Sequence, residues 1–225
     1  MGNLVGNIAR IADASTVDGP GVRTTIWFQG CRNRCPGCQN EALQDPAGGN
    51  SLDVVALGHM LRIVNVLSSA AGNHLYTVTG GEPFDQPLAL ALMLSSLRAH
   101  DPDAHVIVYT GYTWELLQAS GRKTATERLA MQQIDVLVDG PYIAELDDDK
   151  RQYVGSSNQR VIRVKESLES GQLVLEDWDS AALFTILDGQ VTMAGGWLEE
   201  VNVAGIGTVT EAPLCGQAER GKGSD

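Results

Sequence analysis

Three cysteines lie within eight residues of each other, at Cys31, Cys35 and Cys38. A cubane iron–sulfur cluster has four irons and normally takes four cysteine thiolates. A C-x3-C-x2-C loop supplies ligands for three irons and leaves the fourth open to a molecule that binds there and accepts one electron. We therefore predict that these cysteines hold one [4Fe-4S] cluster that performs chemistry rather than simple electron storage.

Other uses of cysteine fit the chain less well. Disulfide scaffolds are short, secreted and rich in cysteine, whereas this chain of 225 residues has four cysteines, with Cys215 far from the rest. A structural zinc site usually adds a second pair of cysteines or histidines, and the histidines here are scattered. Zinc and redox thiols stay as alternatives, and we expect Cys215 to be an incidental thiol.

Composition limits the class of protein. Hydrophobic residues make up 43% of the chain, enough for a packed core, and no apolar run approaches the roughly 20 residues of a membrane span. The net charge of −12 argues against nucleic-acid binding, which needs a basic surface. The amino terminus lacks the features of a signal peptide. We expect a cytoplasmic protein that binds neither nucleic acid nor membrane.

Positive charge is concentrated around the cysteines, at Arg23, Arg32 and Arg34. Such a patch is suited to an anionic substrate or to the acidic edge of a partner. Arginines in a polar loop also commonly face solvent, and for Arg32 and Arg34 the sequence does not decide between these hypotheses.

Apolar and β-branched segments alternate with segments of helical period, which predicts an α/β fold with a largely parallel sheet. Too few units are present for a closed eight-fold barrel, so we expect a partial (βα)-type barrel with a splayed sheet. Ser51 is the expected N-cap of the first helix. The expected strands are residues 23–28, 75–79, 105–109, 134–138 and 160–164, and the expected helices are residues 52–69, 87–100, a segment from about 113, and 124–133.

Glycine-rich and polar segments follow directly after these strands. They are the cysteine loop, Gly80–Pro83, Thr110–Tyr112 and Asp139–Pro141. In open and barrel α/β folds, active sites assemble at the carboxyl ends of the strands. We therefore expect the four segments to form one site.

The character of the sequence changes beyond about Lys165. We expect residues 1–165 to be the core domain and residues 166–216 to be a small β-rich appendage of unknown role. Within the appendage, Asp188 and Gly189 are suited to a two-residue hairpin turn. Residues 217–225 are expected to be a disordered tail.

Several motifs together resemble one known family. The cysteine loop, Gly80–Pro83, Tyr109–Tyr112, Asp135–Gly140 and Gly155–Arg160 occur in the same order as in the anaerobic ribonucleoside-triphosphate reductase activating proteins. These are radical S-adenosylmethionine (radical SAM) enzymes of the glycyl-radical activase group, whose entry segment is similar to Val17–Arg23. The resemblance covers roughly residues 8–164, and this chain runs about sixty residues further than such activases often do.

The resemblance implies a binding site for S-adenosylmethionine. Glycines allow close backbone approach, and a carboxylate at Glu82 is suited to the α-ammonium group of the cosubstrate, although a surface glutamate after a Gly-Gly turn is the simpler structural role. Asp135 and Asp139 lie four residues apart on one expected strand and so share a face. Either one of them orients the ribose or a cation, or Asp139 merely caps a helix or a turn. Ser156, Ser157 and Asn158 either bind the cosubstrate, rim the partner groove or form a polar loop. The residues expected at the cofactor are Gly37, Cys38, Gln39, Gly80, Gly81, Glu82, Thr110 and Asp139.

The function implied is reductive cleavage of S-adenosylmethionine to methionine and a 5′-deoxyadenosyl radical, which generates a glycyl radical on a partner enzyme. That partner would be an anaerobic ribonucleotide reductase, with a flavodoxin-type protein as electron donor. Two other classes stay open: a small-molecule radical enzyme similar to 7-carboxy-7-deazaguanine synthase, and a non-catalytic iron–sulfur or zinc interaction module. The sequence does not indicate the oligomeric state.

Overall fold

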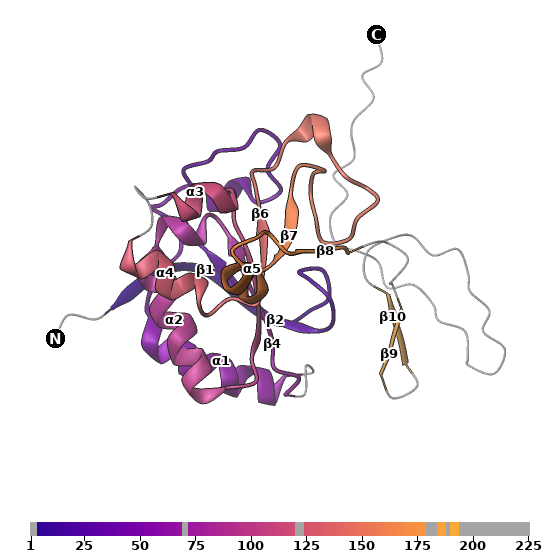
Figure 1. Ribbon diagram of the computed structural model, residues 1–225. Helices are drawn as coiled ribbons and strands as arrows, with labels where there is room; N and C mark the ends of the chain where they lie inside the picture. Colours follow the sequence, from indigo (N-terminus) through magenta and orange to yellow (C-terminus); the bar gives the residue numbers. More distant parts are fainter. Residues whose placement is uncertain (1–3, 69–71, 120–123, 179–183, 188–189, 194–225) are drawn as a thin grey trace, which may run out of the picture. The chain divides into compact units, whose positions relative to one another are not determined.

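The structure is a computed structural model that describes residues 4–68, 72–119, 124–178, 184–187 and 190–193 (Figure 1). Its main element is an eight-stranded sheet in the order β3-β1-β2-β4-β5-β6-β7-β8, and β9 and β10 form a separate pair. The sheet is open, because β3 and β8 are its two edge strands. The α/β class is therefore confirmed.

The bounds of the elements agree with most of the predicted segments. The strands are β1 (Val5–Ser15), β2 (Arg23–Phe28), β3 (Asn50–Asp53), β4 (Leu75–Gly80), β5 (His105–Tyr109), β6 (Val136–Asp139), β7 (Arg160–Arg163), β8 (Leu175–Glu176), β9 (Phe184–Leu187) and β10 (Gln190–Met193). The helices are α1 (Val54–Leu67), α2 (Pro87–His100), α3 (Trp114–Gln118), α4 (Ala125–Met131) and α5 (Val164–Ser170), with 3₁₀ turns η1 (Glu41–Leu43), η2 (Pro83–Asp85) and η3 (Ala144–Leu146).

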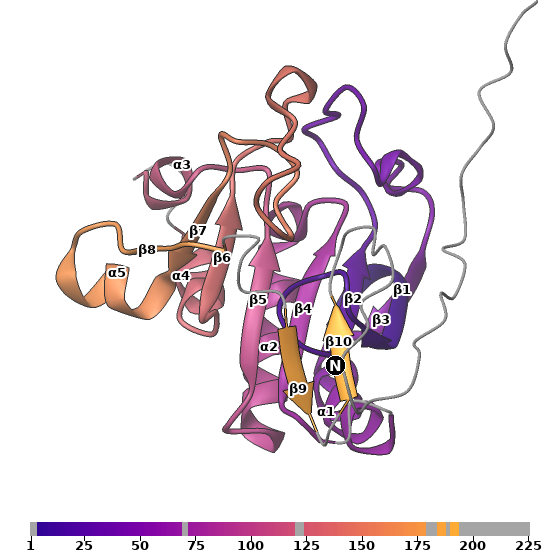
Figure 2. The same cartoon turned by 90° about the vertical axis from the view of Figure 1, so that its right-hand side faces the viewer.

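The centre of the sheet is parallel and its flanks are antiparallel. Strands β2, β4, β5 and β6 run in the same direction, while β1, β3, β7 and β8 pair antiparallel. The prediction of parallel strands is thus correct for the central four, whose residues are largely buried, as expected of a sheet covered on both faces. Their carboxyl ends all reach the upper edge of the sheet in Figure 2.

Helices α1, α2 and α4 cover one face of this sheet (Figure 1). Alternate strand residues such as Ile26, Val78 and Val108 are fully buried against them. On the other face, a second cluster forms around Ile107 and Val138 and is closed by residues from beyond β6. The period of two along each strand decides which residues face which layer.

One expectation about the amino-terminal part is wrong, and one strand there was not predicted. Ser51 does not cap a helix; it lies in β3, where it pairs with Asn7 of β1. The N-cap of α1 is Asp53, whose carboxylate accepts hydrogen bonds from the backbone N–H groups of Val55 and Ala56, both at 3.0 Å. Pairing with β1, a strand that we did not predict, delays the start of the helix by two residues.

The carboxyl-terminal part is described in pieces. Strand β7 pairs with β8, and α5 spans Lys165. Strand β9 pairs antiparallel with β10, with Leu187 opposite Gln190, as the hairpin prediction requires, while its turn residues Asp188 and Gly189 lie outside the described residues. Cys215 and the predicted tail also lie outside them, and the division at Lys165 stays a prediction.

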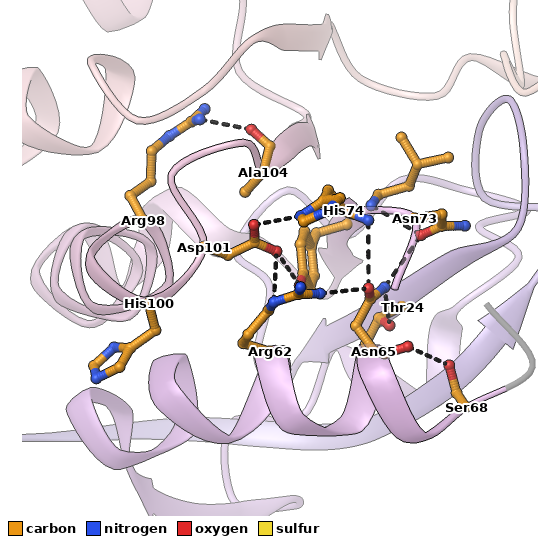
Figure 3. Close-up of polar contacts among 12 residues, drawn as sticks. Thr24, Arg62, Asn65, Ser68, Asn73, His74, Arg98, His100, Asp101 and Ala104 are labelled. Carbon is orange, nitrogen blue, oxygen red and sulfur yellow. Dashed lines mark hydrogen bonds and ion pairs between the residues drawn. The ribbon is translucent and has the colours of Figure 1, made fainter. Parts of the chain in front are cut away.

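A buried polar network ties the helices to the sheet at the edge opposite the four loops (Figure 3). Asp101, at the end of α2, is 1% exposed. Its carboxylate accepts hydrogen bonds from His74 at 2.5 Å and from the Tyr76 hydroxyl at 2.6 Å, and it lies 3.6 Å from the Arg62 guanidinium on α1. A buried carboxylate is tolerated only when it is paired in this way.

Replacing Asp101 with alanine should therefore destabilise the protein strongly. Removing one member of a buried ionic network leaves the others unpaired, at a cost of about 3 kcal/mol. Chemical denaturation of Asp101→Ala measures this loss in the free energy of unfolding. The matched control is Asp103→Ala, because Asp103 is exposed and should change stability by less than about 0.5 kcal/mol. Equal stability of the two variants would contradict the structural role of the network.

Candidate functional site

A pocket of about 360 Å³ lies where the loops after β2, β4, β5 and β6 meet. Parallel strands bring their carboxyl ends to one edge, so the predicted gathering of these loops is found. Of the residues predicted for the site, those that line the pocket are Cys31, Cys35, Cys38, Gln39, Gly80, Gly81, Glu82 and Thr110.

The three cysteines are partly exposed free thiols on one loop. Burial raises the pKa of the Cys31 thiol, and backbone N–H groups of Arg34 and Asn33 oppose that rise. Burial likewise raises the pKa of Cys35, opposed by the backbone of Tyr142. Backbone N–H donors directed at the sulfur atoms suit metal-bound thiolates, which lose their protons on binding.

The arrangement suits a cluster better than a single ion. One zinc ion needs all its sulfur ligands at about 2.3 Å. Within the part of the chain that the structure describes, no three His, Cys, Asp or Glu side chains are close enough together to hold one metal ion. Three thiols spread around a shared pocket, none of them in a disulfide, are compatible with a larger group that each thiol binds at a different iron.

Hydrogen bonds from the backbone of Gly30, Cys31 and Arg32 fix the beginning of the cysteine loop to neighbouring segments. Gly30 and Cys31 donate backbone hydrogen bonds to the carbonyls of Leu43 and Gln44. The backbone N–H of Arg32 donates to the Asp85 carboxylate at 2.9 Å, and this carboxylate also accepts from the Tyr112 hydroxyl at 2.6 Å. The loop is therefore positioned by residues that follow β4 and β5.

Glu82 connects three of the four loops. Its Oε1 accepts from the Thr110 hydroxyl at 2.8 Å and from the Phe84 N–H at 2.9 Å. Its Oε2 accepts from the Gly111 N–H at 2.7 Å and from the Asn33 amide at 3.2 Å. The side chain is 1% exposed. Burial raises its pKa to about 7, while these hydrogen bonds favour the ionised form and limit the rise.

Gly81 allows the loops after β2 and β4 to touch. A Cβ on Gly81 would lie 2.2 Å from the carbonyl oxygen of Gly30, and the Glu82 N–H donates to this same oxygen at 2.8 Å. The absence of a side chain thus brings Glu82 beside the cysteine loop.

Two of the predicted cofactor residues do not line the pocket. Gly37 has a positive φ of 71° and lies in a turn in which the Cys38 N–H donates to the Cys35 carbonyl at 3.3 Å, next to Tyr142. Asp139 is 1% exposed; its carboxylate forms an ion pair with Arg160 at 2.5 Å and accepts from the Trp114 N–H at 2.6 Å. Its expected partner on the same face, Asp135, precedes β6 and instead binds Arg98 at 2.7 Å.

The segment from Pro141 to Gln159 closes the pocket in a way that the sequence did not indicate. Gly155 and Gln159 line the pocket, whereas Ser156 and Asn158 do not. Ser156 accepts from the Ile143 N–H at 3.2 Å, and Asn158 donates to the Pro141 carbonyl at 2.8 Å. These two side chains hold the segment in place.

Other residues of the site were also missed. Asn33, Asp18, Tyr109 and Tyr153 line the pocket, and Tyr153 has a positive φ of 58°. Asn33 lies inside the cysteine motif, so its position was the available signal. Tyr109 and Asp18 lie inside the motifs Tyr109–Tyr112 and Val17–Arg23, which were the available signals, whereas only the packing of distant segments brings Tyr153 to the site.

The α/β fold and a pocket lined by three free thiols are compatible with an iron–sulfur protein. A family described as "4Fe-4S single cluster domain" matches residues 17–162, well over half of the chain. Anaerobic ribonucleoside-triphosphate reductase-activating proteins are similar over most of their own length. That of Pasteurella multocida is 29% identical over 160 residues, covering 70% of this chain and 97% of the relative. That of Escherichia coli (strain K12) is 30% identical over 148 residues, covering 64% and 90%.

The corresponding protein of Enterobacteria phage T4 is 27% identical over 157 residues, covering 69% of this chain and 92% of the relative. The chain therefore belongs to the family of anaerobic ribonucleoside-triphosphate reductase-activating proteins and carries its 4Fe-4S domain. Across the described segments, every helix is too short or too polar to cross a membrane.

Gly81→Ala should disrupt this site more than Gly111→Ala. The Cβ at Gly81 meets backbone of Gly30, which cannot move without separating two loops, whereas the Cβ at Gly111 meets the end of the Asn33 side chain. We expect Gly81→Ala to lower stability by about 2 kcal/mol and to reduce cluster incorporation. Denaturation and iron content measure both. Equal effects of the two substitutions would contradict the close contact at Gly30.

Proposed function

We propose that this protein uses a [4Fe-4S] cluster held by Cys31, Cys35 and Cys38 to cleave S-adenosylmethionine reductively. The product would be a glycyl radical on a partner enzyme, as expected of a radical SAM activase. The observation that carries the proposal is the shared pocket, in which the three thiols face Gly80, Gly81 and Glu82. Three protein ligands for four irons leave one iron for the cosubstrate.

When bound together, the reduced cluster and S-adenosylmethionine supply the chemistry, in which one electron breaks a carbon–sulfur bond and a hydrogen atom is taken from a glycine Cα of the partner. The protein would bind and orient the cluster and the cosubstrate, and it would keep water away from them. The glycines at 80 and 81 admit the amino-acid end of the cosubstrate to the rim of β4. The carboxylate of Glu82 would bind its ammonium group.

This ammonium group would have to replace or join donors already on Glu82. The two backbone donors, from Phe84 and Gly111, are fixed by the chain. The Asn33 amide makes the longest of the four hydrogen bonds, 3.2 Å, so it is the donor most readily displaced. Gln39 and Thr110, which also line the pocket, would contact the remainder of the cosubstrate. Gly37 would contribute only through the turn that it makes, and for Asp139 we favour the structural role.

The relatives are named for activating an anaerobic ribonucleoside-triphosphate reductase, which supports such a reductase as the partner. We further propose a flavodoxin-type electron donor and a cytoplasmic location. The open sheet with four parallel central strands supports a partial (βα)-type barrel over residues 1–165. Residues 166–216 would then be the appendage and residues 217–225 the tail.

The direct test is anaerobic reconstitution followed by reduction in the presence of S-adenosylmethionine and an anaerobic ribonucleotide reductase. We expect release of methionine and 5′-deoxyadenosine, and a glycyl radical signal in electron paramagnetic resonance. Cys35→Ala should lose the intact four-iron cluster and both activities, whereas Cys215→Ala should keep them. Cosubstrate cleavage without a glycyl radical would exclude the activase function, and a complete cluster in Cys35→Ala would exclude the ligand assignment.

Cosubstrate binding should depend on pH through Glu82. The pKa of Glu82 is raised to about 7 by burial, so acidification protonates the carboxylate and removes its attraction for an ammonium group. Between about pH 7.5 and 6, the affinity of the cluster-loaded protein should fall up to roughly tenfold. Equilibrium dialysis under anaerobic conditions measures this affinity.

Glu82→Gln should bind weakly and show no such pH dependence. Glu169→Gln is the control, because Glu169 is exposed on α5 and should behave as the unchanged protein does. An affinity that stays constant across this pH range in the unchanged protein would argue against contact between Glu82 and the ammonium group.

A further inference from the structure

Cys31 lies between two separate cavities. The first is the pocket that all three cysteines line. The second, of about 500 Å³, is lined by Asn7, Arg32, Arg34, Asp85 and Gln86 among others, and among the described residues Cys31 alone lines both. We call the second one the arginine cavity. The cluster ligand Cys31 is therefore approached from two directions, and only one of them passes through the cosubstrate pocket.

The arginine cavity carries positive charge that carboxylates do not neutralise. Several other arginines in the described residues are in close ion pairs, such as Arg98 with Asp135 at 2.7 Å and Arg151 with Asp148 at 2.6 Å. The side chain of Arg32 is 79% exposed, and its Nε lies 4.0 Å from Asp85. Arg34 is exposed and forms no ion pair with any described residue.

The one carboxylate in the arginine cavity faces inward. The side chain of Asp85 is 10% exposed. Its two oxygens accept from the Tyr112 hydroxyl and from the Arg32 backbone N–H. Asp85 therefore holds the cysteine loop in place, while the two guanidinium groups are left at the surface beside Cys31.

The backbone of the cysteine loop has an unusual conformation at one of the two exposed arginines. Arg34 has a positive φ of 49°, a conformation that side chains other than glycine adopt infrequently and that is often found at functional sites. The conformation lies between Cys31 and Cys35. The two exposed arginines therefore lie within one or three residues of Cys31 on the same loop.

We propose that the arginine cavity is the docking site for the acidic face of a protein that donates single electrons to the cluster. The proposal rests on the proposed function, which requires a reduced cluster. Because the chain has a net charge of −12, an acidic partner is repelled by most of its surface and is attracted only where positive charge is locally exposed. In the transfer the donor loses one electron and the cluster gains one, and no bond forms or breaks.

Two separate routes to the cluster also suit a reaction in which the electron arrives after the cosubstrate and the partner have bound. A donor at the arginine cavity reaches the cluster through Cys31 without occupying the pocket that Glu82 and Gly81 line. Cosubstrate and the partner's glycine can then be bound while the electron is delivered.

The test follows the reduction of the cluster itself, by loss of its visible absorbance in a stopped-flow instrument, with neither S-adenosylmethionine nor reductase present. The reconstituted full-length protein is mixed with a reduced, acidic flavodoxin or with reduced methyl viologen, a small cation. The charge-reversal variant is Arg32→Glu/Arg34→Glu. Its charge-conserving counterpart is Arg32→Lys/Arg34→Lys, and Lys165→Glu on the exposed surface of α5 is the remote control.

At low salt we expect charge reversal to slow reduction by flavodoxin at least tenfold, because steering by charge changes association rates by factors of 10 to 10³. The lysine variant and Lys165→Glu should stay within about twofold of the unchanged protein. At about 0.5 M salt, where charges are screened over a few ångströms, the difference should largely disappear. Reduction by methyl viologen should not be slowed by charge reversal.

Three results would overturn the proposal. They are an equally slow reduction by flavodoxin in Lys165→Glu, a slower reduction that persists at high salt, and an equally slower reduction by methyl viologen. The last result would mean that the arginines act on the cluster and not on the donor. Failure of the proposed function is distinguishable, because it would appear as a protein that binds no cluster or whose reduced cluster does not cleave S-adenosylmethionine with either reductant.

Discussion

The buried carboxylate of Glu82 is the interaction on which the candidate site depends. It accepts four hydrogen bonds, from the loops after β2, β4 and β5. A buried carboxylate is costly unless such donors surround it, so each loop is held where its donor is needed. The close approach of Gly81 to Gly30 makes this geometry possible, and the cysteine loop is positioned as a consequence.

The amino-terminal and carboxyl-terminal edges of the parallel strands carry different kinds of polar groups. At the amino-terminal edge of β4 and β5, Asp101 joins α1 and α2 to the sheet through contacts that are satisfied within the protein (Figure 3). At the carboxyl-terminal edge, thiols, glycines and the Glu82 carboxylate are among the groups that border a pocket. This division follows from parallel strands, whose carboxyl ends leave loops free to vary while the other edge is packed.

Charge is also distributed unevenly. The chain is acidic as a whole, and the described arginines distant from the cysteines are largely used in ion pairs, such as that of Arg160 with Asp139 and Glu115. Arg32 and Arg34 are exposed, and Asp85, which lies 4.0 Å from Arg32, is held inward by the Tyr112 hydroxyl. The positive charge near Cys31 is thus a result of how the neighbouring carboxylate is held, and not only of the residues in the motif.

The sequence by itself determined the order of most strands and helices and the edge at which polar segments meet, because these depend on spacing and on local periodicity. Its assignment of the three cysteines as cluster ligands stays a prediction. The sequence misplaced the start of α1 at Ser51, since the pairing of β3 with β1 involves residues more than forty positions apart. Only the tertiary structure decided that Asp139 forms an ion pair with Arg160. It also decided that Ser156 and Asn158 support a loop. The same holds for Asn33 and Asp85, which join the cysteine loop to its neighbours. Hydrogen bonds between side chains of distant segments leave no periodic trace in the sequence, so only the folded chain reveals which polar groups are already satisfied and which face a ligand.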